Sequence, residues 1–139
     1  PRKPLGPNRV VNHMLEHLVD EDTWDANDFD ALLKLAPKYG VFMNSHTFEV
    51  DLFQVGLYGA FAEAMEGLVS NIKIRERMKN WAADPGTLDV DAFLKDIEFV
   101  GKGRFAQRVS SIIVESGLTV CPKYISKGVE YVADRCKHS

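Results

Sequence analysis

The residues best suited to chemistry lie together at Thr47, Glu49 and Asp51. A hydroxyl and two carboxylates alternate along this segment, which closely follows a run of apolar residues. Hard cations such as Mg²⁺ and Mn²⁺ take oxygen ligands, and they usually bind through one or two carboxylates together with water and a substrate phosphate. The segment therefore suits a divalent-cation site. A helix start with Thr47 as its N-cap explains the same residues without a metal.

A second candidate is Lys102, which lies between Gly101 and Gly103. Glycine lets a backbone approach a phosphate closely, and the beginning of a helix offers unpaired N–H groups to an anion. A lysine at such a point can neutralise charge in a transition state. The trio is not a Walker loop, because it lacks that loop's glycine spacing and the Ser or Thr that follows the lysine. A helix C-cap followed by a solvated basic turn is the alternative interpretation.

A competing motif lies at His13, Glu16 and His17. It matches the H-x-x-E-H pattern of inverted zinc peptidases, in which two histidines one turn apart hold zinc and the glutamate activates water. These three side chains fall on the face of the predicted helix opposite its apolar stripe. A solvated helix face therefore explains them equally well, and the motif by itself has a high false-positive rate.

Length and composition limit the classes of protein that the sequence can represent. A chain of 139 residues, 45% of them hydrophobic, is long enough for one domain with its own core. No apolar run approaches the roughly 20 residues that span a bilayer, and residues 1–7 lack the layout of a secretion signal. We expect a cytoplasmic protein without a membrane partner. The two cysteines, fifteen positions apart, fit neither a zinc site nor a disulfide framework.

The net charge of −3 conceals a difference between the two halves of the chain. Residues 1–70 contain five basic and eleven acidic side chains, whereas residues 71–139 contain twelve and nine. Nucleic-acid affinity depends on where lysines and arginines cluster on the surface. The weakly basic second half therefore permits nucleic-acid binding and does not establish it.

One strand and several helices must position these candidates. The apolar run Gly40–Met43 predicts a strand buried on both faces, and ligands bind beyond the ends of such strands in open α/β sheets. Apolar periodicity predicts helices over about 8–19 and 27–36, from about 57 to 83, from about 87 to 100, from about 104 to 116, and after Pro122. The expected inward-facing residues of the last helix are Ile125, Val129 and Val132.

Together, the predicted elements form a mostly helical chain around at least one buried strand. That is too little sheet for a complete α/β domain, so we predict an α/β fold whose missing strands come from elsewhere. The chain is expected to be a single domain, 1–139, and a fragment of a longer protein.

Read together, the segments Gly40–Phe53 and Gly101–Arg108 resemble the latter part of the Toprim nuclease domain of OLD (overcoming lysogenization defect) family endonucleases. In that family a strand carries a short Ser/Thr-x-Glu segment to a metal site, a helical insertion follows, and a lysine-bearing turn returns to the active centre. The resemblance covers about residues 9–133. It implies a partial Toprim-like sheet over about 9–56 and 100–139, with a large helical insertion over about 57–99.

The resemblance also implies roles for particular residues. Glu49 and Thr47 match the metal-binding segment, and Lys102 matches the active-site lysine, so Glu49 and Lys102 are the expected catalytic residues. Arg104 and Arg108 are candidates for binding the DNA backbone. The implied activity is DNA endonuclease cleavage, the hydrolysis of phosphodiesters with two Mg²⁺ or Mn²⁺ ions.

The sequence also departs from the family's pattern. Toprim domains need an earlier Glu and an Asp-x-Asp pair on strands, and neither is found in a fitting position. Those ligands and the ATPase domain that binds ATP are expected upstream of Pro1, so this fragment alone is expected to be incomplete as a nuclease. A zinc peptidase using His13, Glu16 and His17 and a non-catalytic helical interaction domain remain alternatives, and a homo-oligomer is left open.

Overall fold

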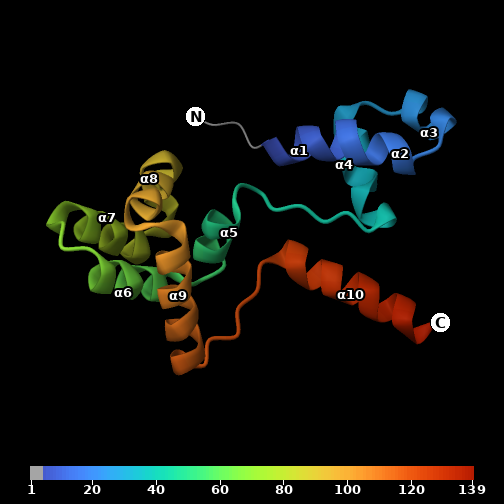
Figure 1. Ribbon diagram of the computed structural model, residues 1–139. Coiled ribbons are helices and arrows are strands. Elements are labelled where there is room, and N and C mark those ends of the chain that lie inside the picture. Colours follow the sequence, from blue (N-terminus) through green and yellow to red (C-terminus); the bar gives the residue numbers. More distant parts are fainter. Residues whose placement is uncertain (1–4) are drawn as a thin grey trace. The chain divides into compact units, whose positions relative to one another are not determined.

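The computed structural model describes residues 5–139, which are predominantly helical and contain no strand. The chain forms two compact units (Figure 1). One unit consists of Phe48–Cys121 and is called the bundle unit here. The other combines residues 5–47 with Pro122–Ser139 and is called the split unit. Each unit is described by itself.

The bundle unit contains five α-helices and one short 3₁₀ turn. These are α5 (Phe48–Gln54), α6 (Tyr58–Leu68), α7 (Ile72–Ala83), η3 (Pro85–Thr87), α8 (Val90–Val100) and α9 (Lys102–Ser116). Side-chain caps fix two of the helix starts: Asn71 accepts a hydrogen bond from the Lys73 N–H at 3.0 Å, and Asp89 accepts one from Ala92 at 3.0 Å. Gly117, with φ +63°, ends α9 in the left-handed conformation that glycine adopts at least cost.

The core of the bundle unit is a cluster of aromatic rings. Phe93 is fully buried and contacts Phe53, Phe61 and Trp81, with ring centroids 5.2, 5.8 and 6.2 Å away. Phe105 of α9 joins through Phe61 at 5.2 Å. Edge-on and offset ring pairs at these separations add to the stabilisation that burial of each ring already provides. Helices were predicted over the segments of α6 to α9, and each of these helices contributes buried residues to this core.

A buried ion pair joins α7 to α8. Among the described residues, Asp96 is the charged side chain that is buried. Both of its carboxylate oxygens accept hydrogen bonds from Arg77, one from Nη2 at 2.6 Å and the other from Nε at 3.1 Å. Hydrogen bonding to Asp96 raises the pKa of the Arg77 guanidinium above its ordinary value. Because the bidentate contact satisfies the carboxylate, Asp96 needs no ligand or substrate to explain its burial.

The split unit is built from shorter helices. These are α1 (Leu5–Val10), the π-helical turn η1 (Val11–Leu15), α2 (Glu16–Leu18), α3 (Glu21–Ala26), α4 (Phe29–Leu35), the 3₁₀ turn η2 (Ala36–Tyr39) and α10 (Lys123–Lys137). The acidic run after Val19 begins α3, a helix that the sequence analysis did not predict. Asp20 caps it by accepting the Thr23 N–H at 2.8 Å, and this backbone hydrogen bond is the main cause that lowers the pKa of Asp20.

The strand predicted at Gly40–Met43 is not formed in residues 5–139. Val41 to Asn44 are irregular, and they are only partly buried. A strand requires a neighbouring strand to pair its backbone N–H and C=O groups, and the described residues supply none. A partial sheet is therefore not seen among residues 5–139, and its formation with strands from elsewhere stays a prediction; Gly40, which bounds the segment, has φ +76°.

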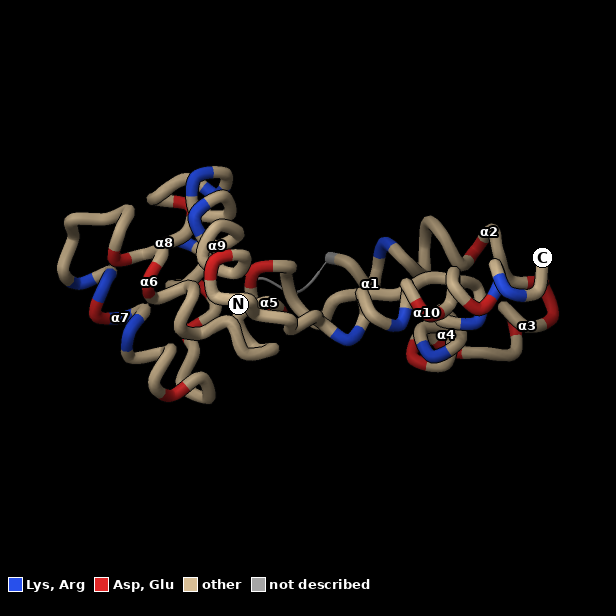
Figure 2. Tube along the Cα trace, turned by 90° about the horizontal axis from the view of Figure 1, so that it is seen from below, with Lys and Arg blue, Asp and Glu red and all other residues tan. Residues whose placement is uncertain are grey.

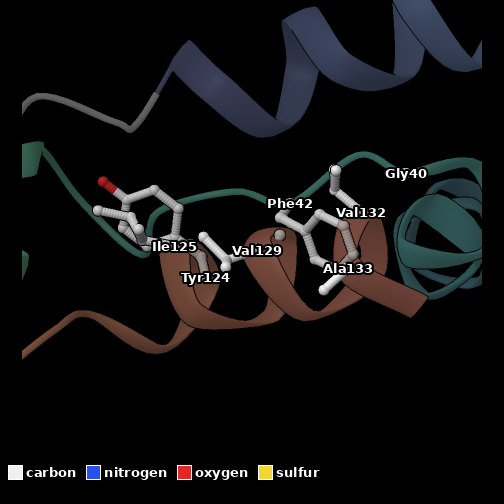
Figure 3. A pocket seen from close by; sticks show the side chains of 8 residues that line it. Gly40, Phe42, Tyr124, Ile125, Val129, Val132 and Ala133 are labelled. Carbon is white, nitrogen blue, oxygen red and sulfur yellow. The ribbon is translucent and has the colours of Figure 1, made fainter. Parts of the chain in front are cut away.

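The last helix, α10, differs from its predicted packing. Val129 and Val132 were expected to face inward, but they are 64% and 59% exposed, and α10 has no buried residue. These side chains line a shallow apolar groove of about 600 Å³ within the split unit, together with Phe42 and Ile125 (Figure 3). Tyr131 of the same helix packs edge-on against Phe42, with ring centroids 5.6 Å apart. It also lies so close to Gly40 that a Cβ there would come within 2.9 Å of its ring.

None of the helices in the described part of the chain is long and apolar enough to cross a membrane. The helical insertion predicted at about 57–99 falls within the bundle unit. The division of the chain into a Toprim part and an insertion stays a prediction.

Candidate functional site

Helix α5 positions Glu49 at the edge of the bundle core. Val50 and Phe53 on its inner face are 2% and 0% exposed, which anchors this seven-residue helix against the aromatic cluster. Glu49 precedes Val50 and therefore lies toward the rim of the buried face. Its side chain is 27% exposed, so its carboxylate is held near the surface of a rigid element and can still reach solvent or a ligand.

Lys102 is the first residue of α9, and Gly101 sets its position. Gly101 has φ +97°, a backbone conformation that side-chain-bearing residues rarely adopt, and it both ends α8 and begins α9. The resulting turn brings the Lys102 ammonium to 3.8 Å from a Glu49 carboxylate oxygen. The two residues are 53 positions apart in the sequence, and the fold of the bundle unit brings them together.

A third side chain joins this pair. Glu98, in the last turn of α8, has a carboxylate oxygen 3.7 Å from the Lys102 ammonium. Glu98 was not among the candidates predicted from the sequence. Its signal was its position four residues before Lys102, a spacing at which opposite charges frequently meet on helical surfaces. We refer to Glu49, Glu98 and Lys102 as the charged centre.

The geometry of the charged centre leaves its members available. Both lysine-to-carboxylate distances exceed the 2.7–3.2 Å of a direct hydrogen bond, and the Lys102 side chain is 55% exposed. Ion pairs of this kind contribute about 0–1 kcal/mol to stability. The centre is therefore a weak structural support. It combines two carboxylates with an exposed ammonium group that lies 3.7 and 3.8 Å from them.

Thr47 and Asp51 lie immediately before α5 and in its first turn. Thr47 is half-buried and precedes α5 directly, but it belongs to the split unit. Asp51 lies in the first turn of α5 and is half-buried. These positions do not test the metal-binding role predicted for Glu49 and Thr47 or the catalytic role predicted for Glu49 and Lys102. The DNA-binding role of the two arginines is likewise untested, and all of these roles stay predictions.

The basic residues of α9 all lie in its first seven positions (Figure 2). Arg104 is exposed. Arg108, one turn later, lies over α6, where its guanidinium is 3.8 Å from a Glu63 carboxylate oxygen. Of the two arginines predicted to bind a DNA backbone, Arg104 is thus the more accessible, since Arg108 already has an acidic neighbour.

The competing zinc motif is solvent-facing. His13, Glu16 and His17 are all exposed, while Val11, Leu15 and Val19 on the opposite face are buried. No group of three or more His, Cys, Asp or Glu side chains in residues 5–139 is arranged to hold a metal ion. The zinc reading therefore gains no support. In the part of the chain that the structure describes, Glu49 and Glu98 therefore do not form such a group with a third side chain.

Comparison with known proteins gives the family context of this fold and centre. No protein-family model matches the chain, and no curated protein is significantly similar to it. Solved structures similar to the chain include two C-terminal regions of OLD proteins. One is the C-terminal region of the Burkholderia pseudomallei OLD protein, with a TM-score of 0.81 and 36% sequence identity over 96% of this chain. The other is the C-terminal region of the Xanthomonas campestris pv. campestris OLD protein, with a TM-score of 0.72 and 34% identity over 95% of this chain.

These similarities define the class of protein: the chain has the helical architecture of the C-terminal regions of the two OLD proteins. The family resemblance seen in the sequence is thereby confirmed, and the chain is a relative of the OLD proteins. It spans 64% and 63% of the lengths of the two solved chains, which is slightly less than two thirds of each.

Proposed function

We propose that this chain contributes the Glu49 and Lys102 side chains to the active centre of a divalent-metal-dependent DNA endonuclease of the OLD family. The reaction is hydrolysis of a phosphodiester. The proposed cofactors are two Mg²⁺ or Mn²⁺ ions in the complete domain, and the proposed substrate is DNA. ATP is assigned to a separate domain that this chain does not contain.

The observation that supports this proposal most strongly is the 3.8 Å approach of Lys102 to Glu49. The resemblance to OLD nucleases requires these two residues to share one centre, although nothing in their spacing along the chain demands it. A different location for either residue would have separated the two halves of the proposed site. The relationship to OLD C-terminal regions supports the same proposal independently of this distance.

Each residue has a definite task in the proposed reaction. The Glu49 carboxylate supplies an oxygen ligand from the rigid α5, and Glu98 supplies a second acidic side chain on the other side of Lys102. The Lys102 ammonium leaves its loose contacts and stabilises negative charge on the phosphate oxygens. Arg104 binds a neighbouring phosphate. Divalent ions held by these carboxylates would supply activation of the attacking water and stabilisation of the departing oxygen.

The incomplete ligand set bears on the rest of the protein. Two carboxylates are fewer than a two-ion centre requires, so the other acidic ligands belong to a part of the domain outside this chain. The proposed fold of that domain is a Toprim-like sheet, with the segment Gly40–Met43 as one of its strands. Such pairing would supply the neighbouring strand that this irregular apolar segment lacks among residues 5–139.

Metal-dependent DNA cleavage is the first expected result. The intact protein, incubated with supercoiled plasmid, is expected to produce nicked and linear DNA in Mg²⁺ or Mn²⁺, and chelation by EDTA should stop the reaction because the carboxylates cannot hold the phosphate without a cation. The products are measured by gel electrophoresis. Zinc alone serves as the comparison with the peptidase alternative.

The proposal fails if folded, metal-supplied protein leaves the plasmid intact in both Mg²⁺ and Mn²⁺. It also fails if the protein binds one Zn²⁺ per chain and loses it on His13→Ala, since that result assigns the metal chemistry to the other motif.

A further inference from the structure

The phenylalanines of the bundle unit fall into two distinct groups. Four of them are core residues with 0–2% exposure: Phe53, Phe61, Phe93 and Phe105. The other two are exposed, Phe48 by 50% and Phe99 by 71%. Each exposed phenylalanine is the sequence neighbour of a glutamate of the charged centre: Phe48 precedes Glu49, and Phe99 follows Glu98.

This placement is specific to the charged centre. Adjacent residues have Cα atoms about 3.8 Å apart, so each ring begins at the border of the centre. The other strongly exposed apolar residues of the bundle unit, such as Ile72 and Val114, are aliphatic and lie on α7 and at the far end of α9. Exposed aromatic rings in the bundle unit are thus found beside the two glutamates that approach Lys102.

Three cationic residues lie close to Phe99 along the chain. Lys95 lies four residues earlier, on the same face of α8, and Lys102 and Arg104 follow at the start of α9. All three are exposed. The acidic residues near these cations are Glu49 and Glu98, which approach Lys102, and Asp91, one turn before Lys95. An aromatic ring between cations is the combination with which proteins hold single-stranded nucleic acid, because bases stack on the ring while the cations contact the flanking phosphates.

We propose that Phe99, assisted by Phe48, is a base-stacking residue, and that the charged centre therefore takes a nucleic acid with an unpaired nucleotide at the bound phosphate. A base inside an intact duplex is already stacked on both sides and cannot lie on a protein ring without being turned out. Single strands, frayed ends and flaps present such a base directly. This inference rests on the proposed function and specifies its substrate class.

The stacking role is tested by binding, separately from cleavage. The probe is a fluorescently labelled single-stranded oligodeoxynucleotide, titrated with the intact protein in Ca²⁺ and in EDTA, and compared with the same sequence as a duplex. Phe99→Ala is expected to weaken single-strand binding by about 5- to 100-fold, as stacking on one ring contributes. Duplex binding should change less than about twofold.

Three further variants test whether the aromatic ring of Phe99, and not its apolar area alone, causes the single-strand binding. Phe99→Trp retains a stacking surface and is expected to bind as the wild type does, whereas Phe99→Leu retains apolar area without a ring and should bind as weakly as Phe99→Ala. Val114→Ala removes an equally exposed apolar side chain far from the charged centre and is expected to have no effect. Phe99 is too exposed for its replacement to unfold the bundle unit.

Several outcomes overturn the inference: wild-type affinity of Phe99→Ala for single strands, wild-type affinity of Phe99→Leu, or equal losses for single strand and duplex. If Phe99→Leu binds normally, an apolar contact with a protein partner explains the exposed ring better. The two proposals fail separately. Phe99-dependent binding without cleavage in any metal removes the nuclease and keeps the stacking residue, whereas cleavage with unchanged binding of Phe99→Ala does the opposite.

Discussion

Replacing Lys102 with alanine is expected to lower the rate of DNA cleavage by the intact protein by about 100-fold or more. Removal of one group that stabilises transition-state charge typically has an effect of about 10² to 10³. Glu49→Ala should reduce cleavage to a similar or greater extent, because it removes an oxygen ligand that α5 holds in place. The rate is measured as the initial conversion of supercoiled to nicked plasmid at saturating Mg²⁺.

Controls of the same residue types separate this effect from a general loss of charge. Lys73 on α7 and Glu115 near the end of α9 are exposed residues of the bundle unit outside the charged centre. Lys73→Ala and Glu115→Ala are expected to cleave within about twofold of the wild type. Thermal melting of all four variants should match the wild type, since a loose surface ion pair contributes little to stability. Normal cleavage by both Lys102→Ala and Glu49→Ala would remove the two residues from the reaction.

The largest expected effect on stability comes from Phe93→Ala. This ring is 0% exposed and contacts three other aromatic residues, so its removal loses the transfer free energy and leaves a cavity that the surrounding rings can only partly fill. The free energy of unfolding of the bundle unit is expected to fall by about 3–5 kcal/mol. Trp81, 6.2 Å from Phe93, reports this transition by its fluorescence in a Trp24→Phe background, where it is the remaining tryptophan.

The same helix provides the matched control. Phe99→Ala removes the same side chain from α8 at a position that is 71% exposed, and it should change the free energy of unfolding by less than about 0.5 kcal/mol. Similar losses for both variants would contradict the assignment of Phe93 to the core. A small loss for Phe93→Ala alone would show that the aromatic cluster rearranges to fill the space.

Much of the bundle unit follows from its sequence because its signals are local. Apolar residues recur with helical spacing, so the inner face of α8 could be identified from Phe93 and Ile97, and that of α9 from Phe105, Val109 and Ile112. The glycines at 101 and 117 mark the helix ends where the backbone has positive φ. These features need no information from distant parts of the chain.

The errors have physical causes that no local pattern contains. An acidic residue after a helix can end that helix or cap the next one, and Asp20 does the second through its bond to Thr23. Gly40–Met43 has the composition of a buried strand, yet strand formation depends on a partner strand. The exposure of Val129 and Val132 likewise depends on what packs against α10, and their apolar spacing gives no information about that.

The candidate site was predictable only in part. The spacing of the two segments did not predict that Glu49 lies beside Lys102. The family resemblance predicted this proximity, and the 3.8 Å distance agrees with it. Glu98 was missed because Gly101 interrupts the helix between it and Lys102, which hid an otherwise ordinary i,i+4 pair. The two exposed phenylalanines carry no motif at all, and their relation to the charged centre emerges only once burial is known for every other ring of the bundle unit.

Whether Glu49 and Lys102 serve one cation and one phosphate is tested most directly by locating Mn²⁺, through its anomalous scattering, in crystals of the intact protein. We expect a manganese peak at coordination distance, about 2 Å, from a Glu49 carboxylate oxygen, with the Lys102 ammonium displaced from Glu49. Manganese bound only elsewhere at saturating concentration, with Lys102 still beside Glu49, would contradict the account.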